Sequence, residues 1–311
     1  MYDVLLVDGK HVLWRSIDVF SDLSVEQDGD ARKTGAIFGF LNIVTRAKAQ
    51  HMSRSGYVVV CWEGGRNLHR RFLYPDYKRN RRGSEIPLDR IELIESMREQ
   101  GETLQKLLAG INVPQGHATG WEADDVMGTL AERWKKMGAK IGVFTGDRDL
   151  LQVVDENVHV IRPGKQGAFS IETPATVKQE YGVTPQGFLF MKTLAGDGGD
   201  GIPGVRGVGM GMAGKVVRAM EAEGLPLTQE NLIAAARRIL PARVHDGLKD
   251  PVVIDLWYEL CRIRRDVKVK FQPTTDWDGK KLESVLREMK FRSWLQPTRL
   301  RQLFELKGGE V

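Results

Sequence analysis

Three short apolar segments that each end in an acidic residue place the strongest constraint on the fold of this chain. They read YDVLLVD at residues 2–8, YVVVCWE at 57–63 and KIGVFTGD at 140–147. Continuous runs of Val, Ile and Leu of this length are typical of strands buried on both faces, as in a parallel sheet. Apolar residues at helical spacing lie between them, over 37–44, 91–108 and 126–137. The apolar residues over 91–108 indicate one long helix, or two helices broken near Gly101. This alternation predicts a doubly wound α/β fold, whose sites form beyond the carboxyl ends of the strands.

The composition excludes several other classes of protein. The 311 residues are 41% hydrophobic and 28% charged, which is ordinary for a globular chain and argues against disorder. No apolar run reaches the ~18–20 residues that span a bilayer, and the N-terminus lacks the features of a signal peptide. Two cysteines, Cys61 and Cys261, cannot form a disulfide framework. We therefore expect a reduced, cytoplasmic protein without membrane association.

Acidic residues gather at five places along this predicted order of strands and helices. The candidate metal ligands are Asp8, Glu63, Glu122, Asp124, Asp125, Asp147, Asp149, Asp197 and Asp200. Taken singly, each has an ordinary explanation as a helix cap or a turn residue. Gathered together they would repel one another without a cation, and carboxylate oxygens are the ligands that Mg²⁺ and Mn²⁺ prefer. We expect two such ions ~3.5–4 Å apart, as in enzymes that cleave phosphodiesters.

A basic segment directly follows the second acid-ended strand. Residues 66–82 hold one acid, Asp76, and seven bases, a net charge of +6 against +5 for the whole chain. The bases are Arg66, Arg70, Arg71, Lys78, Arg79, Arg81 and Arg82. Aromatic residues interleave with them, a pattern that suits single-stranded nucleic acid, although a solvated basic loop is the alternative. Because the segment leaves the sheet at the acidic edge, we expect Lys78 or Arg79 to lie over a scissile phosphate.

A glycine-rich segment at 196–214 precedes a helical stretch at 215–223. The apolar residues Ile202, Val205 and Val208 punctuate it, which indicates tight turns between two short helices rather than a flexible linker. Backbone N–H groups at such turns, together with a following helix N-terminus, can bind phosphates. The alternative is a purely structural turn.

In this order the motifs resemble those of the 5′-nuclease superfamily, which includes flap endonucleases, phage 5′–3′ exonucleases and the 5′-nuclease domain of bacterial DNA polymerase I. The resemblance covers residue 3 to about 217 and rests on LLVDG, VVVCWEGG, FLYPDYKRNRR, EADDV, TGDRDLLQ, LAGDGGDGIPGV and GVGMGMA. It implies an α/β fold with a PIN-like, mostly parallel sheet flanked by helices. It also implies a catalytic domain at 1–195 with a helical arch at about 66–98, and a helical region at 196–311 with a DNA-binding helix–three-turn–helix. The length fits a stand-alone phage or bacterial type.

The resemblance also implies roles for individual residues. Asp8, Glu63, Glu122 and Asp124 match one metal group, and Asp125, Asp147, Asp149, Asp197 and Asp200 match the other, with Asp124 shared. Lys78, Tyr77 and Arg82 match catalytic positions in the arch. The expected DNA contacts are Arg70, Arg71, Arg79, Arg81, Gly207, Gly209, Gly211 and Lys215. A K⁺ ion is expected at the helix–three-turn–helix.

Two positions depart from the family pattern. The second strand-end acid is usually Asp, whereas here it is Glu63, one methylene longer. The hairpin usually reads close to GIGPKTA, whereas here it is GVGMGMA at 207–213, without the Lys and the Thr. We therefore expect backbone N–H groups and Lys215 to make the phosphate contacts there.

The sequence thus predicts a divalent-metal-dependent, structure-specific 5′-nuclease, a 5′–3′ exonuclease or flap endonuclease of DNA replication and repair. Water activated by a bound ion attacks the phosphodiester, the second ion neutralises the leaving oxygen, and Lys78 adds positive charge. The expected partners are DNA with 5′ ends, flaps or nicks, and RNA primers in RNA–DNA hybrids. A monomer in the cytoplasm is expected, the host cytoplasm if a phage encodes it. Two alternatives stay open, namely a PIN-type ribonuclease and a non-catalytic protein that binds branched DNA.

Overall fold

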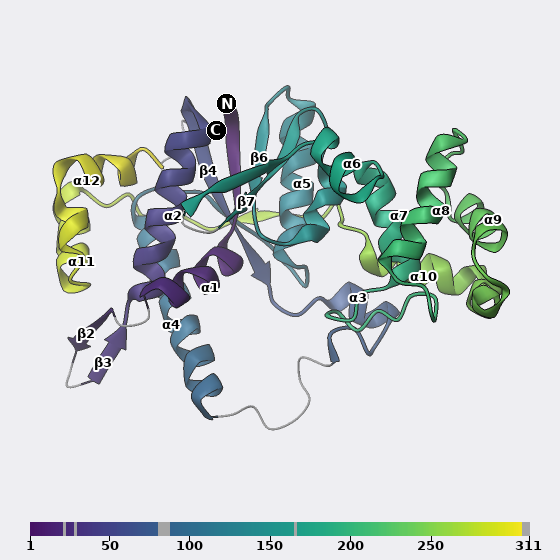
Figure 1. Cartoon of the computed structure of the whole chain (residues 1–311). Coiled ribbons are helices and arrows are strands. Elements are labelled where there is room, and N and C mark those ends of the chain that lie inside the picture. The colour runs from purple at the N-terminus through teal and green to yellow at the C-terminus, as the bar shows by residue number, and fades with distance from the viewer. Residues whose placement is uncertain (21–22, 28–29, 80–87, 165–166, 307–311) are drawn as a thin grey trace.

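The structure, a computed structural model, describes residues 1–20, 23–27, 30–79, 88–164 and 167–306 (Figure 1). At its centre is a seven-stranded sheet in the order β8-β7-β6-β1-β4-β5-β9. The strands are β1 (Tyr2–Asp8), β4 (Met52–Gly64), β5 (Gln115–Thr119), β6 (Ile141–Phe144), β7 (Val158–Pro163), β8 (Phe169–Glu172) and β9 (Lys270–Phe271). The five strands from β7 to β5 are parallel, while β8 and β9 pair antiparallel at the edges. The three strands predicted from the sequence are therefore present, side by side.

The register of these strands places their acidic ends together. Asp8 of β1 lies opposite Cys61 of β4, two residues before Glu63. On the other side, Val7 lies opposite Phe144, the last residue of β6, and Asp147 follows three residues later. Because parallel strands end at the same edge, these three acids meet at one side of the sheet, as the sequence predicted.

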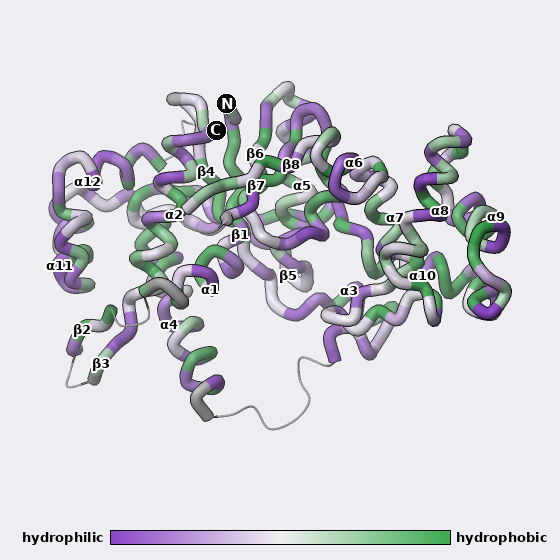
Figure 2. Tube along the Cα trace, in the orientation of Figure 1, coloured by the Kyte–Doolittle hydropathy of each residue, from purple (hydrophilic) through white to green (hydrophobic). Residues whose placement is uncertain are grey.

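Both faces of the sheet are buried, because successive side chains of each strand point to opposite faces. Val4 and Leu6 belong to one hydrophobic core, with the helices α5, α7, α8, α9 and α10. Leu5 and Val7 belong to the other, with α1, α2 and α4 and with the C-terminal helices α11 and α12. Figure 2 shows hydrophobic residues along the strands in the middle of the molecule. This burial explains why the strands read as continuous apolar runs.

The helices follow the predicted stripes closely. Those of the first half are α1 (Gly9–Phe20), α2 (Gly35–His51), α3 (Leu68–Leu73), α4 (Leu88–Gly110) and α5 (Ala123–Lys136), and a hairpin of β2 (Ser24–Gln27) and β3 (Asp30–Lys33) follows α1. Helix α4 runs without a break through Gly101, so one long helix is the correct alternative. The arch predicted at 66–98 includes α3 and the start of α4, while residues 80–87 lie outside the described residues.

The second half is mostly helical, as was predicted for residues 196–311. It contains the 3₁₀ turn η2 (Arg148–Val153), then α6 (Pro174–Tyr181), α7 (Pro185–Ala195), α8 (Met210–Ala222), α9 (Gln229–Ile239), η4 (Ala242–Leu248), α10 (Pro251–Cys261), α11 (Gly279–Glu288), η5 (Arg292–Leu295) and α12 (Pro297–Phe304). The glycine-rich turns join α7 to α8, and α8 begins at Met210, earlier than the predicted 215. An earlier start brings Ala213 and Gly214 onto the buried face of the helix.

The C-terminal part divides between the two ends of the molecule. Helices α8 to α10 lie at one end, and α11 and α12 lie beside α2 at the other (Figure 1). Leu286 and Trp294 belong to the same core as Leu5 of β1, and β9 extends the sheet. The predicted boundary at residue 195 therefore does not separate two hydrophobic cores. Among the described helices, none is both long and apolar enough to cross a bilayer.

Candidate metal and nucleic-acid site

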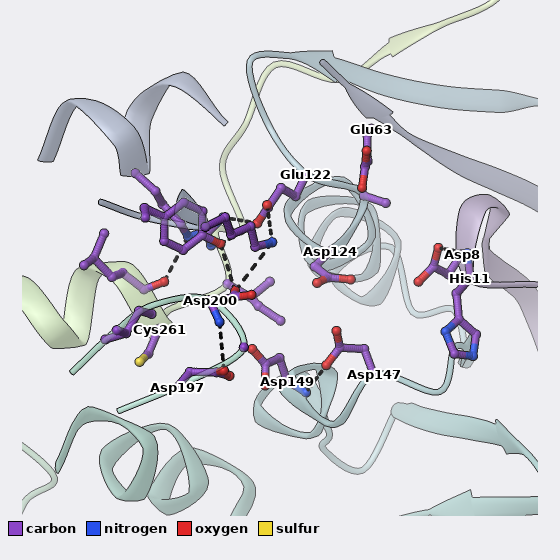
Figure 3. Close-up of a pocket in the computed structure, with 18 of the residues that line it drawn as sticks. Asp8, His11, Glu63, Glu122, Asp124, Asp147, Asp149, Asp197, Asp200 and Cys261 are labelled. Atoms are coloured by element: carbon purple, nitrogen blue, oxygen red, sulfur yellow. Dashed lines mark hydrogen bonds and ion pairs between the residues drawn. The ribbon is translucent and has the colours of Figure 1, made fainter. Parts of the chain in front are cut away.

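The carboxyl ends of β1, β4 and β6 open into an acidic cavity of about 380 Å³. Eight of the nine predicted metal ligands line it, and Figure 3 shows them around one space. They are Asp8, Glu63, Glu122, Asp124, Asp147, Asp149, Asp197 and Asp200. The convergence that spacing could only predict is therefore present in the structure.

Local hydrogen bonds fix the acids at the strand ends. Asp147 caps η2, and its Oδ1 accepts the N–H of Asp149 at 2.9 Å. The hydroxyl of Thr145 donates to Oδ2 of Asp8 at 3.0 Å and accepts the N–H of Asp147 at 3.1 Å. His11 N–H donates to the other oxygen of Asp8 at 2.9 Å. Thr145 thus links the ends of two neighbouring strands, a role that nothing in the sequence motif singled out.

Three of the acids form a tight group. One carboxylate oxygen each from Asp149, Asp197 and Asp200 lies within 4.8 Å of the others. Asp197 and Asp200 reach this position because the turn after α7 closes through paired backbone hydrogen bonds between Asp197 and Ile202, both at 2.8 Å. An all-carboxylate group of this kind fits a hard divalent cation.

Burial raises the pKa values of three of the acids in the cavity, Asp8, Asp124 and Asp149. Burial, and then the nearby Asp147 and Asp8, raise the pKa of Asp124 well above its ordinary range. Burial raises the pKa of Asp149 to about 6, although Lys192 opposes the shift. Burial also raises the pKa of Asp8, against its hydrogen bonds. Negative charge is therefore costly here, and a bound cation would relieve the cost.

Lys192 of α7 is a buried base that sequence reasoning missed. Its ammonium forms an ion pair with Asp149 and donates to Oδ2 of Asp197 at 2.7 Å. The residue is only 6% exposed, and burial, which lowers its pKa, is outweighed by Asp149, so that the pKa is raised. The available signal was a single lysine within the otherwise apolar run FLFMKTLA at 188–195, directly before an acidic motif.

Tyr77 and Lys78 bring the basic segment into the acidic cavity. The Tyr77 hydroxyl donates to Glu122 at 2.9 Å and to Asp200 at 3.0 Å, and the ring is 2% exposed. Lys78 pairs with Glu122, and its Nζ lies 3.5 Å from Oδ2 of Asp200. Burial raises the pKa of Glu122, but Lys78 and Arg70 outweigh it and lower the pKa overall. Lys78, one of the two bases expected to lie over a scissile phosphate, thus lies beside the carboxylates of the cavity.

Asp125 is a correction to the predicted ligand set. It is fully buried, does not line the cavity, and forms a two-pronged ion pair with Arg70, at 2.7 and 2.8 Å. Its oxygens also accept the N–H groups of Arg264 at 3.0 Å and Glu122 at 3.4 Å. All of its oxygen lone pairs therefore face donors from the protein. One step of an α-helix turns a side chain by ~100°, which separates Asp125 from its neighbour Asp124.

Arg70 is the matching correction among the predicted DNA contacts. It is 4% exposed, and besides Asp125 it donates to Glu122 and to the carbonyl oxygens of Leu260 and Arg262. A guanidinium with these partners is not available to DNA phosphates. It joins α3, α5 and the end of α10 at the wall of the cavity.

The other predicted residues lie at the surface or outside the described chain. Glu63 pairs with Lys10 at 2.9 Å at the exposed rim of the cavity. Arg79 is exposed and pairs with Asp76, and Arg71 is half-buried. Gly207 has a φ of 83°, and Gly209 is the N-cap of α8 with open space around it, as at Gly211. Lys215 is exposed. Arg81 and Arg82 lie outside the described residues.

A second cavity of about 880 Å³ connects the metal candidates to the glycine-rich turn. Asp147, Asp149 and Asp197 line it at one side, and Met210 and Gly211 of α8 line it at the other. Two bases that sequence reasoning missed, Arg148 and Arg218, also line it. The acidic cavity and the start of α8 therefore share one groove.

Comparison with known proteins identifies the family. Residues 3–182 match the family described as 5′-3′ exonuclease, N-terminal resolvase-like domain. The chain belongs to this family. Within it, the chain is 32% identical to the 5′-3′ exonuclease of Bacillus subtilis (strain 168) over 252 residues, 79% of each protein. It is 29% identical to DNA polymerase I of Bacillus caldotenax over 300 residues, 94% of this chain and 32% of that one. The chain spans about a third of the length of such polymerases.

Solved structures share the fold of this family member. The bacteriophage T5 D15 flap endonuclease, in a pseudo-enzyme-product complex with DNA and metal ions, has a TM-score of 0.64 at 15% identity, covering 97% of this chain and 96% of that one. Human GEN1, in complex with Holliday junction DNA, has a TM-score of 0.57 at 15% identity, covering 98% and 71%. The predictions of the family and of a mostly parallel, PIN-like α/β fold are confirmed.

Proposed function

We propose that this chain is a divalent-metal-dependent, structure-specific 5′-nuclease that hydrolyses DNA phosphodiesters at 5′ ends, flaps or nicks. The observation that carries the proposal is the meeting of eight carboxylates with Lys78 in one cavity at the sheet edge. Membership of the 5′-3′ exonuclease family supports it. So do the metal ions and DNA bound to the T5 protein that shares this fold.

The proposed metal ligands form two groups. Asp8, Glu63, Glu122 and Asp124 form one, and Asp147, Asp149, Asp197 and Asp200 form the other, with Asp124 between them. The proposed ions are Mg²⁺ or Mn²⁺, because every donor is a carboxylate oxygen. When bound, two such ions supply an activated water and neutralise charge on the leaving oxygen. A K⁺ ion at the turns before α8 remains a separate proposal.

The basic side chains of the cavity have positioning and electrostatic roles in this proposal. Tyr77 bridges Glu122 and Asp200, so it holds carboxylates from two different segments at a fixed spacing. Lys78 contacts the same two carboxylates, and its proposed role is to stabilise negative charge that develops on a phosphate. The proposed catalytic role of Arg82 rests on the sequence motif alone.

The proposed duplex path follows the groove from the acidic cavity to the start of α8. Backbone N–H groups at Gly207, Gly209 and Gly211, with Lys215, are the proposed phosphate contacts there. Arg71, Arg79 and Arg81 are proposed contacts in the arch. We further propose that the protein acts as a monomer in the cytoplasm, and that RNA primers in RNA–DNA hybrids are substrates.

The test is cleavage of a 5′-labelled DNA flap duplex, with Mg²⁺ or with EDTA. The proteins are the wild type, Asp147→Asn and, as a matched control, Asp246→Asn, because Asp246 is an exposed acid of η4 that does not line the cavity. We expect Mg²⁺-dependent products near the flap junction from the wild type and the control, and none from Asp147→Asn. Intact DNA in every lane with binding retained would identify a DNA-binding protein instead. Cleavage of a matched RNA strand, with the DNA flap left intact, would identify a ribonuclease.

A further inference from the structure

The three aromatic residues of the basic segment have different surroundings. Tyr77 is buried, and its hydroxyl bonds to carboxylates of the cavity. Tyr74 packs edge-on against Trp257 of α10, with 5.4 Å between the ring centroids. Phe72, on α3, is 86% exposed. Of these three residues, Phe72 is the exposed one, so its ring is the most accessible to a partner from solution.

The geometry of α3 gives Phe72 a neighbour on the same face. Arg70 points toward the cavity, and Leu68 and Phe72 lie two residues to either side of it, ~200° around the helix. They therefore lie on the face opposite Arg70. Residues four apart on a helix are neighbours, so Leu68, which is 64% exposed, lies one turn from Phe72 on the same face, and these two residues are the apolar pair of α3.

This apolar pair has a rigid support. Arg70 is held by Asp125, by Glu122 and by two backbone carbonyl groups, and Asn67 caps the helix by accepting the N–H of Arg70 at 2.8 Å. The N–H of Leu68 donates to the carbonyl of Gly120 at 3.0 Å. The exposure of Phe72 is thus a property of an anchored helix, and little order would have to be gained on binding.

The charge next to this pair suits a polyanion. Arg66, which is exposed, lies two residues before Leu68 and just ahead of the N-cap Asn67, and Arg71, which is half-buried, precedes Phe72 in the helix. Carboxylates already pair with Arg70, Lys78 and Arg79, so among the described residues of the basic segment the remaining positive charge belongs to Arg66 and Arg71. An exposed aromatic face beside cations is the arrangement that binds unpaired nucleotides, where the ring stacks on a base and the cations contact phosphates.

We propose that Phe72, supported by Leu68, is a stacking platform for an unpaired base of the 5′ flap. This inference rests on the proposed function, because the flap is the single strand that would pass α3 on leaving the cavity. Phe72 is then a specificity residue, which favours substrates with unpaired bases and takes no part in the chemical step. Stacking accepts every base, so the platform selects for strand structure rather than for sequence.

The test compares two substrates that differ only in the flap. One flap carries normal bases, and the other carries abasic sites with the same phosphates. Phe72→Ala should raise KM for the normal flap about fivefold to tenfold, as expected for the loss of one stacked base, and leave kcat unchanged. It should leave KM for the abasic flap unchanged. Phe72→Trp should restore the wild-type KM. Phe271→Ala, which removes a partly exposed ring from β9, should leave KM unchanged for both substrates.

A direct measurement separates this inference from the proposed function. A 2-aminopurine base in the flap should lose fluorescence on binding the wild type in Ca²⁺, and keep it on binding Phe72→Ala. If the wild type binds the flap but never cleaves it, the nuclease proposal fails while this measurement still decides the platform. Equal KM increases on normal and abasic flaps, or no change on either, would overturn the platform, as would equal quenching by both proteins.

Discussion

The acidic cavity and the ion pair beneath it are two regions built from neighbouring residues of one motif. Asp124 lies in the cavity, where burial and then the neighbouring carboxylates raise its pKa. Asp125, the next residue, lies below the cavity against Arg70 and is fully buried. The first region stores repulsion that a cation can relieve, while the second is already neutral. The difference shows that adjacent acids can serve binding in one case and folding in the other.

Removing the charge of Asp125 should have the largest effect on stability. In Asp125→Asn the buried Arg70 loses its main partner, and breaking a buried ion pair in this way costs about 3–5 kcal/mol. Denaturant unfolding of the metal-free protein should therefore show a lower free energy of unfolding by that amount. The number of ions bound to the folded variant should equal that of the wild type. If an ion were lost instead, Asp125 would be a ligand and the distinction between the two regions would fail.

Removing the charge of Asp124 should lower the cleavage rate without lowering the stability of the fold. Asp124→Asn removes a proposed ligand, and the cleavage rate should fall about 100-fold or more, which corresponds to about 2.7 kcal/mol or more in activation free energy. The metal-free variant should be as stable as the wild type or more stable, because one member of a repelling group becomes neutral. Single-turnover cleavage and denaturant unfolding measure the two effects. A large loss of stability would show that Asp124 is structural.

Metal binding should stabilise the wild type by a smaller amount. At a Mg²⁺ concentration of about ten times Kd, mass action predicts about 1.4 kcal/mol of added stability per ion. Calorimetric scans with Mg²⁺ and with EDTA should show this as a higher Tm in Mg²⁺, and Asp124→Asn should show a smaller rise. An equal rise in the wild type and in Asp124→Asn would mean that the ion binds elsewhere.

The smallest expected effect on stability comes from a half-exposed ion pair. Lys135 contacts Asp155 at 2.9 Å, and burial of Asp155, which raises its pKa, is outweighed by this contact, so that the pKa is lowered. Lys135→Gln should cost less than about 1 kcal/mol at pH 7. Because the folded state lowers this pKa, the contribution is present above the ordinary value of 3.8 and is lost as the pH falls below it. Denaturant unfolding of the wild type and of Lys135→Gln at pH 7 and at pH 3 would measure this contribution. A larger difference in free energy of unfolding between the two proteins at pH 3 than at pH 7 would contradict the prediction.

Much of the site was predictable because strand ends have fixed places in a parallel sheet. Asp8, Glu63 and Asp147 each follow an apolar run, and parallel pairing brings such ends to one edge. The partners of these acids were less predictable. Lys192 lies outside the motifs, and Thr145 lies within TGDRDLLQ without a role that the motif assigns. Their contacts depend on how α7 and the end of β6 pack.

The sequence alone determined the strands, the acidic edge, the entry of a basic segment beside it and the family. These follow from local patterns, because burial on two faces selects apolar runs and parallel strands share an edge. Only the tertiary structure decided that Asp124 faces the cavity while Asp125 faces Arg70, and that Tyr77 is buried while Phe72 is exposed. The physical reason is that each step along a helix or turn rotates a side chain toward a different neighbour, and those neighbours come from distant parts of the chain.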